Sequence, residues 1–120
     1  MKWGGTLYRV VNNNISIIRG DSARISLSIQ NADGSEYTIL PTDSVTMMVR
    51  KTPTSEVVIS KTLDNGLLTI EPADTEGLPF GSYVYDIQIV HGADNGWTDT
   101  IIPIHRFDVL QEVTYGYGGD

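Results

Sequence analysis

Cysteine is absent from this chain of 120 residues, and its absence excludes several kinds of site at once. Disulfide frameworks, cysteine-ligated zinc, iron–sulfur clusters and thiol nucleophiles all require that side chain. Basic residues are also scarce, because 8 Lys and Arg stand against 15 Asp and Glu, for a formal net charge of −7. A nucleic-acid-binding face and a surface for anionic membranes both need clustered basic residues. We therefore expect neither nucleic acid nor membrane as a partner.

Long apolar runs and helical periodicity are missing too. No stretch approaches the roughly 20 apolar residues of a membrane span, and residues 1–5 lack the apolar run of a signal peptide. We expect a soluble product of the cytoplasm, unless an assembly carries it elsewhere. No segment keeps an apolar period of about 3.6 residues, so the only helical candidate is one turn at residues 72–76.

What the chain does have is turn chemistry separating short segments rich in Ile, Val, Thr and Tyr. Strict alternation of apolar and polar residues is clearest at 22–30, and an Asn-Gly pair at 65–66 indicates a hairpin turn. This rhythm predicts an all-β fold of about seven to ten strands. The expected strands are residues 7–11, 15–18, 22–30, 37–40, 45–50, 56–63, 67–70, 83–90, 97–102 and 104–110.

One domain is the expectation at this length, because two independent cores would each be marginal. We assign residues 1–114 to a single β-sandwich domain with an N-terminal arm. Residues 115–120 contain no aliphatic side chain, so we expect a flexible Gly/Tyr tail. The predicted core consists of Ile25, Leu27, Ile29, Val45, Met47, Val49, Tyr85, Ile87, Ile89 and Phe107.

The most informative stretch is residues 72–85, where a short turn carrying Asp and Gly leads to a Tyr at the start of a strand. This order is typical of the tyrosine corner of immunoglobulin-like sandwiches, in which the phenol hydroxyl bonds to upstream backbone. Tyr83 takes that role, and Tyr85 lies where antibody domains place a disulfide cysteine. The sequence therefore predicts an immunoglobulin-like sandwich that is not of the antibody type.

An ordered series of phrases resembles a known family. The phrases are IRGDS at 18–22, ADG at 32–34, VRK at 49–51, IEPADT at 70–75, GSYVYDIQ at 81–88 and FDVL at 107–110. Together they look like the N-terminal domain of the phage baseplate upper protein family of tailed phages and prophages. The resemblance implies a β-sandwich module of the baseplate, tail or an accessory fibre, without catalytic residues. It also implies other virion proteins as partners, and a location in the virion after assembly in the host cytoplasm. On the particle we expect the module to form a homo-oligomer.

Other motifs have plainer explanations than a site. Arg19-Gly20-Asp21 spells an integrin-recognition tripeptide, but between two strands it is expected to form a tight bend. Acidic loops such as Asp33 and Glu36 offer oxygen ligands for calcium, yet their residues also suit turns. His91 and His105 fit surface positions, and no Gly-x-Ser-x-Gly or phosphate-binding Gly loop is present. We therefore expect no enzyme, no cofactor and no metal.

Aromatic side chains supply the alternative function. The candidates for exposure are Trp3, Trp97, Tyr115 and Tyr117. A row of aromatic rings on a sandwich face is how carbohydrate-binding modules stack on sugars, so host-surface glycan is the alternative partner. Trp97 follows a hairpin turn, and a partly buried tryptophan at a strand start is the commoner outcome.

Overall fold

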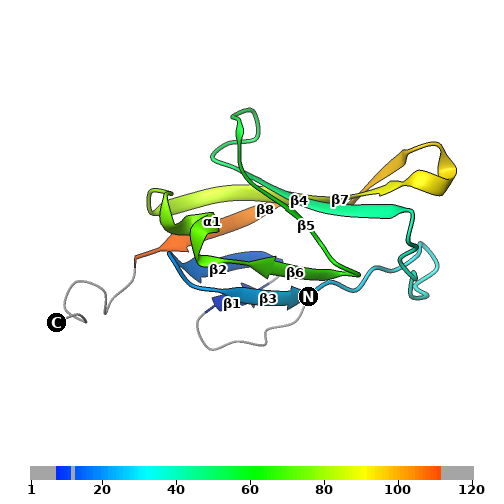
Figure 1. Cartoon of the computed structure of the whole chain (residues 1–120), viewed down its shortest axis with the longest axis horizontal. Coiled ribbons are helices and arrows are strands. Elements are labelled where there is room, and N and C mark those ends of the chain that lie inside the picture. The colour runs from blue at the N-terminus through cyan, green and yellow to red at the C-terminus, as the bar shows by residue number, and fades with distance from the viewer. Residues whose placement is uncertain (1–7, 12, 112–120) are drawn as a thin grey trace.

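A computed structural model describes residues 8–11 and 13–111 of the chain, so the predicted arm at 1–5 and the tail at 115–120 lie outside the described residues. The fold is mostly β, with one short helix and one 3-10 turn (Figure 1). The elements are β1 (Tyr8–Val11), β2 (Asn14–Ile18), β3 (Ala23–Ser26), β4 (Asp43–Arg50), β5 (Val57–Thr62), β6 (Leu67–Ile70), α1 (Pro72–Glu76), β7 (Gly81–His91), η1 (Gly92–Asp94) and β8 (Trp97–Leu110).

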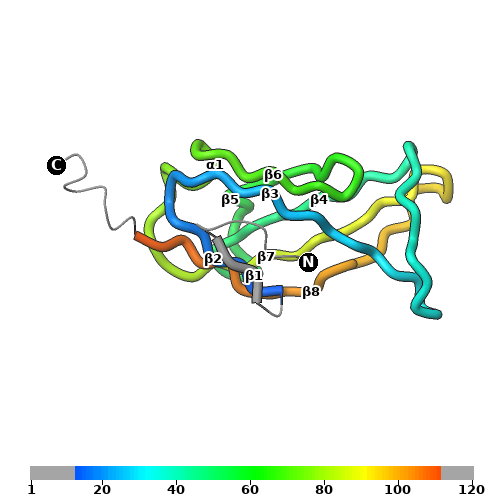
Figure 2. Tube along the Cα trace, turned by 90° about the horizontal axis from the view of Figure 1, so that it is seen from below, coloured from blue at the N-terminus to red at the C-terminus, as the bar shows by residue number. Residues whose placement is uncertain are grey.

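The strands form one large mixed sheet and one small sheet. The large sheet has the order β1-β2-β8-β7-β4-β5, in which β2 and β8 are parallel and the other neighbours are antiparallel. The small sheet consists of β3 and β6, paired antiparallel. Figure 2 shows β3 and β6 on one side of the molecule, with β7 and β8 on the other.

Both sheets contribute to a single hydrophobic core. Alternation along β4 buries Val45, Met47 and Val49, while β3 contributes Ile25 from the opposite side. Eight of the ten predicted core residues are buried, which confirms the choice of inward faces. The prediction was wrong for Leu27 and Ile29, which are only partly buried against this core.

The early end of β3 explains this error. The prediction of a strand at 22–30 was too long, because β6 offers only four residues for pairing and the ladder ends with Ser26 opposite Leu67. Beyond that point the Leu27 amide donates to the Gly66 carbonyl, and the Tyr37 amide donates to the Ile29 carbonyl. Leu27 therefore still bonds to the turn before β6, whereas Ile29 bonds to the segment that precedes β4.

Two further strand predictions need correction. Residues 37–40 form no strand, and only an isolated bridge joins Gln30 to Glu36. The predicted strands 97–102 and 104–110 are one strand, β8, which passes Pro103 where the register against β7 shifts. Proline has no amide hydrogen to donate, and such an irregularity accommodates it.

The Asn-Gly pair forms the predicted tight hairpin turn, across which Asp64 and Leu67 exchange two backbone hydrogen bonds of 2.9 Å. Asn65 and Gly66 both have positive φ, at 51° and 86°, as a tight primed turn requires. The flanking strands β5 and β6 nevertheless belong to different sheets, so the turn moves the chain from one sheet to the other. The predicted helical turn at 72–76 is confirmed as α1. Within the described part of the chain, no helix is long and apolar enough to cross a membrane.

Candidate functional site

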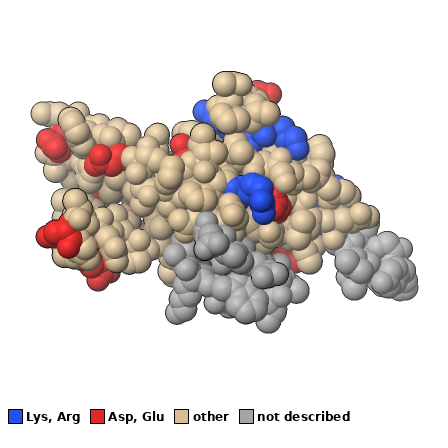
Figure 3. All heavy atoms as spheres, turned by 180° about the vertical axis from the view of Figure 1, so that it is seen from behind, with Lys and Arg blue, Asp and Glu red and all other residues tan. Residues whose placement is uncertain are grey.

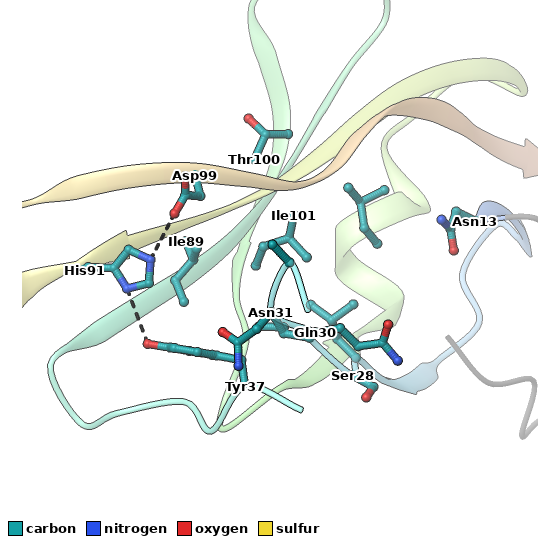
Figure 4. A pocket seen from close by; sticks show the side chains of 14 residues that line it. Asn13, Ser28, Gln30, Asn31, Tyr37, Ile89, His91, Asp99, Thr100 and Ile101 are labelled. Atoms are coloured by element: carbon teal, nitrogen blue, oxygen red, sulfur yellow. Dashed lines mark hydrogen bonds and ion pairs between the residues drawn. The ribbon is translucent and has the colours of Figure 1, made fainter. Parts of the chain in front are cut away.

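An open groove of about 680 Å³ lies between β8 and the segment that follows β3. Its lining comes from Asn13, from residues 27–32, from Tyr37, and from the adjoining parts of β7 and β8 (Figure 4). Leu27, Ile29 and Ile101 supply apolar surface, while amide, hydroxyl and carboxylate groups supply polar surface. The mixture suits a ligand that is held by hydrogen bonds as well as by apolar contact.

The groove exists because β8 has different neighbours along its length. Residues 107–110 pair with β2, and the Arg106 amide donates to Asn14 Oδ1 at 2.9 Å. Among the residues that the structure describes, residues 97–105 have a strand partner on the β7 side only. Because β3 also ends early, neither sheet covers the space between β8 and residues 27–31.

A hydrogen-bonded cluster closes one end of the groove. His91 Nδ1 lies 3.2 Å from Asp43 Oδ1, and His91 Nε2 lies 3.2 Å from Asp99 Oδ2. The Tyr37 hydroxyl donates to Asp43 Oδ2 at 2.5 Å and lies 3.3 Å from His91 Nδ1. Figure 4 shows the imidazole between Tyr37 and Asp99. The cluster joins the loop before β4 to the β7–β8 hairpin.

Local sequence places these groups together. Asp43 begins β4 and is the direct register partner of His91, the last residue of β7. Asn95 and Gly96 adopt positive φ in the following turn, which returns the chain so that Trp97 pairs with His91. Asp99 then lies two residues along β8.

One hydrogen bond shifts the pKa values of both Asp43 and Tyr37. Donation by the Tyr37 hydroxyl, with further donation by the Leu40 amide, lowers the pKa of Asp43 below its usual value despite the burial of its carboxylate, which is 1% exposed. The same hydrogen bond raises the pKa of Tyr37 to about 12, because the negative carboxylate stabilises the protonated phenol. The charged form of Asp43 and the neutral form of Tyr37 therefore support each other.

The end of the molecule that contains the groove is acidic. Residues 25–43 and 88–102 contain no Lys or Arg. The acidic residues in these two segments are Asp33, Glu36, Asp43, Asp94 and Asp99. Figure 3 shows acidic but no basic side chains at the left-hand end of the face in view, with the basic groups nearer the middle.

The structure places two of the five aromatic residues that the sequence singled out. The Tyr83 hydroxyl donates to the Pro79 carbonyl at 2.8 Å, and its side chain is buried. Trp97 is 63% exposed, so the expected partly buried tryptophan is wrong, and its indole donates to Asp99 Oδ1 at 3.3 Å. Tyr115 and Tyr117 lie outside the described residues, as does Trp3.

The Arg-Gly-Asp tripeptide forms the expected bend. Gly20 has a φ of 86°, and its amide donates to Thr75 Oγ1 at 2.8 Å. The Arg19 guanidinium lies 4.1 Å from the centre of the Phe80 ring. These contacts tie the tripeptide to the region of α1 rather than presenting it at a loop tip.

Sequence reasoning missed the role of His91 in the cluster. It assigned the residue to a surface beside a turn, whereas the side chain contacts Asp43, 48 positions earlier in the chain. Only the β4–β7 register brings these positions together, and no sequence spacing indicates it. Among the described residues, no group of three or more His, Asp or Glu side chains is placed to hold a metal ion.

In comparisons with protein-family models, with curated proteins and with solved structures, the chain has no match.

Proposed function

We propose that this chain is a non-enzymatic docking component of a tailed-phage or prophage virion, in the baseplate, the tail or an accessory fibre. It would be made in the host cytoplasm and assembled with other virion proteins, with copies repeated around the particle. The observation that carries the proposal is that residues 97–105, beside an open groove, pair on the β7 side only among the residues that the structure describes. An unpaired strand edge is a surface on which another polypeptide can pair through its backbone.

The proposed fold of this component is an immunoglobulin-like sandwich. In this proposed fold, the neighbouring strands β8, β7, β4 and β5 take the places of strands G, F, C and C′, and the β3–β6 pair takes the places of B and E. Tyr83 lies near the start of β7, and its hydroxyl donates to the carbonyl of Pro79, four residues upstream. This hydrogen bond supports a tyrosine corner.

Mass spectrometry of particles purified on a density gradient tests the function. We expect the chain at a fixed ratio to the major tail protein across independent preparations, with an abundant host cytoplasmic protein as the contamination control. A chain that follows the host protein through the gradient, and not the particles, would exclude a virion role.

The alternative is a carbohydrate-binding module for host-surface glycans, and the exposure of Trp97 favours it. The indole donates to Asp99, which lines the groove, and most of the Trp97 side chain is exposed, so the side chain is accessible for stacking on a sugar. A glycan array should show binding that Trp97→Ala abolishes and Ile104→Ala preserves, since Ile104 is an exposed apolar residue of the same strand. Glycan binding that survives Trp97→Ala would exclude Trp97 as the sugar contact. A complete absence of glycan binding would contradict the alternative function.

A further inference from the structure

We infer that the groove binds an extended segment rich in Lys or Arg from a neighbouring virion protein, and that this segment pairs with residues 97–102 of β8 as an added strand. The inference rests on the proposed docking function and names the surface and the chemistry of its partner. Three features of the described residues support it: backbone groups, groove shape and charge.

The backbone of residues 97–102 of β8 can pair with an added strand. Along a strand, successive residues direct their N–H and C=O groups alternately to the two sides. On the side away from β7, residues 97–102 have no strand partner in the described part of the chain, whereas residues 107–110 are paired with β2. An incoming strand would therefore continue the sheet at the place where β2 leaves off. Its hydrogen bonds would not depend on its side chains, which makes the site suitable for an extended segment.

The groove then receives alternate side chains of that segment. An added strand directs every second side chain to each face of the sheet. One row would enter the groove, where Leu27, Ile29 and Ile101 provide apolar contact. A volume of about 680 Å³ has room for a few side chains of moderate size. The other row would remain toward solvent.

The acidic residues around the groove favour a partner segment that is rich in Lys or Arg. Asp99 lines the groove, and Asp33, Glu36, Asp43 and Asp94 lie on the two chain segments around it, with no Lys or Arg in either. Negative potential without any basic counterpart attracts Lys and Arg side chains and disfavours acidic ones. A second copy of this chain, with net charge −7, is a poorer match for this surface than a basic partner.

Pro103 limits the length of the pairing. It follows Ile102 directly, offers no N–H group, and lies where the β7–β8 register shifts. Proline and bulges on an edge strand prevent uncontrolled association between edges. The added strand is therefore short, and side-chain contacts and charge contribute to its specificity.

Calorimetry on the full chain with a synthetic probe tests the inference. The probe is an eight-residue peptide of alternating Lys and Val, capped at both ends, and its Glu-Val counterpart controls for charge. We expect the Lys-Val peptide to bind and the Glu-Val peptide not to bind, with weaker binding as NaCl rises from 50 to 500 mM. Asp99→Asn should weaken binding about two- to fivefold, whereas Glu56→Gln, which removes an exposed carboxylate outside the groove, should leave it unchanged.

Backbone N-methylation of the peptide tests strand addition itself. Methylating every Lys amide or every Val amide blocks opposite sides of the same extended peptide. One set should weaken binding at least about tenfold and the other should not, because only one side pairs with β8. Amide hydrogen exchange of the bound protein should show new protection within residues 97–102.

Several outcomes would overturn the inference. Equal effects of the two N-methylated peptides, equal binding of the Glu-Val peptide, or protection elsewhere in the chain would each exclude a basic strand at β8. Self-association of the free chain that protects the same amides would make the occupant a second copy instead. A chain that is found in purified particles but fails these tests retains the proposed docking function and loses only this surface.

Discussion

At the scale of single residues, the buried hydroxyl of Tyr83 offers the sharpest test of the proposed corner. Its side chain is 3% exposed, and its hydroxyl donates to the Pro79 carbonyl. Tyr83→Phe removes this donor and leaves the carbonyl without that hydrogen bond. We expect a loss of about 1–3 kcal/mol in the free energy of unfolding, measured with urea. A loss near zero would remove Tyr83 from the corner role.

Asp43 gives the chain a predictable response to acid. Because its pKa is lowered in the folded state, mainly by the Tyr37 hydroxyl, its contribution to stability is present above its ordinary pKa near 3.9. That contribution is lost as the pH falls through the lower folded-state pKa. The stability difference between the wild type and Asp43→Asn should therefore stay nearly constant from pH 6 to about pH 5 and shrink as the pH falls further.

A matched variant identifies the cause of this effect. Tyr37→Phe removes the donor that lowers the pKa of Asp43 most, so the pH dependence of its unfolding free energy should be shallower than that of the wild type. An identical slope in both proteins would show that Tyr37 does not set the pKa of Asp43.

At the scale of elements, the link between the β2–β3 turn and α1 depends on one buried side chain. Thr75 is fully buried, and its hydroxyl oxygen accepts a hydrogen bond from the Gly20 amide. Thr75→Val keeps the shape but removes the acceptor, which should cost about 1–3 kcal/mol of unfolding free energy. The Gly20 amide should also exchange faster. Thr75→Ser keeps the acceptor, so unchanged Gly20 exchange is expected there, and equal exchange in both variants would contradict this link.

Strands in which apolar and polar residues alternate over the whole length were predictable from sequence. Strand ends that depend on a pairing partner far away in the sequence were not. The faces of β4 and β7 were predicted correctly because each alternates over its whole length between two partners. The pattern at 22–30 is equally regular, yet β3 ends at Ser26 because β6 offers no further residues to pair with. Residues 37–40 carry strand-forming side chains, but the Leu40 amide donates to the Asp43 carboxylate and not to a strand partner.

The candidate site was less predictable than the fold for the same reason. Trp97 was singled out from its type and its position after a turn, and it is exposed. The groove and the His91 cluster arise from where two strands end and how β4 and β7 align, which local patterns do not encode.

At the scale of the whole molecule, the buried core lies between Ile15 and Val109 among the described residues. Removing residues 115–120 deletes none of those side chains, so the melting temperature should change little. The deletion removes Tyr115 and Tyr117, whose rings we expect to bury apolar area against a neighbouring virion protein, so incorporation into particles should fall. Normal incorporation would show that the tail is dispensable, and an unfolded truncation would show that it belongs to the core.

The most direct measurement of the docking role is a cryo-electron microscopy reconstruction of the assembled particle. The account predicts density for this domain at repeated, symmetry-related positions, with an extended segment of another virion protein alongside residues 97–102 of β8. A reconstruction that accounts for every component of the particle without this domain would contradict the proposed function.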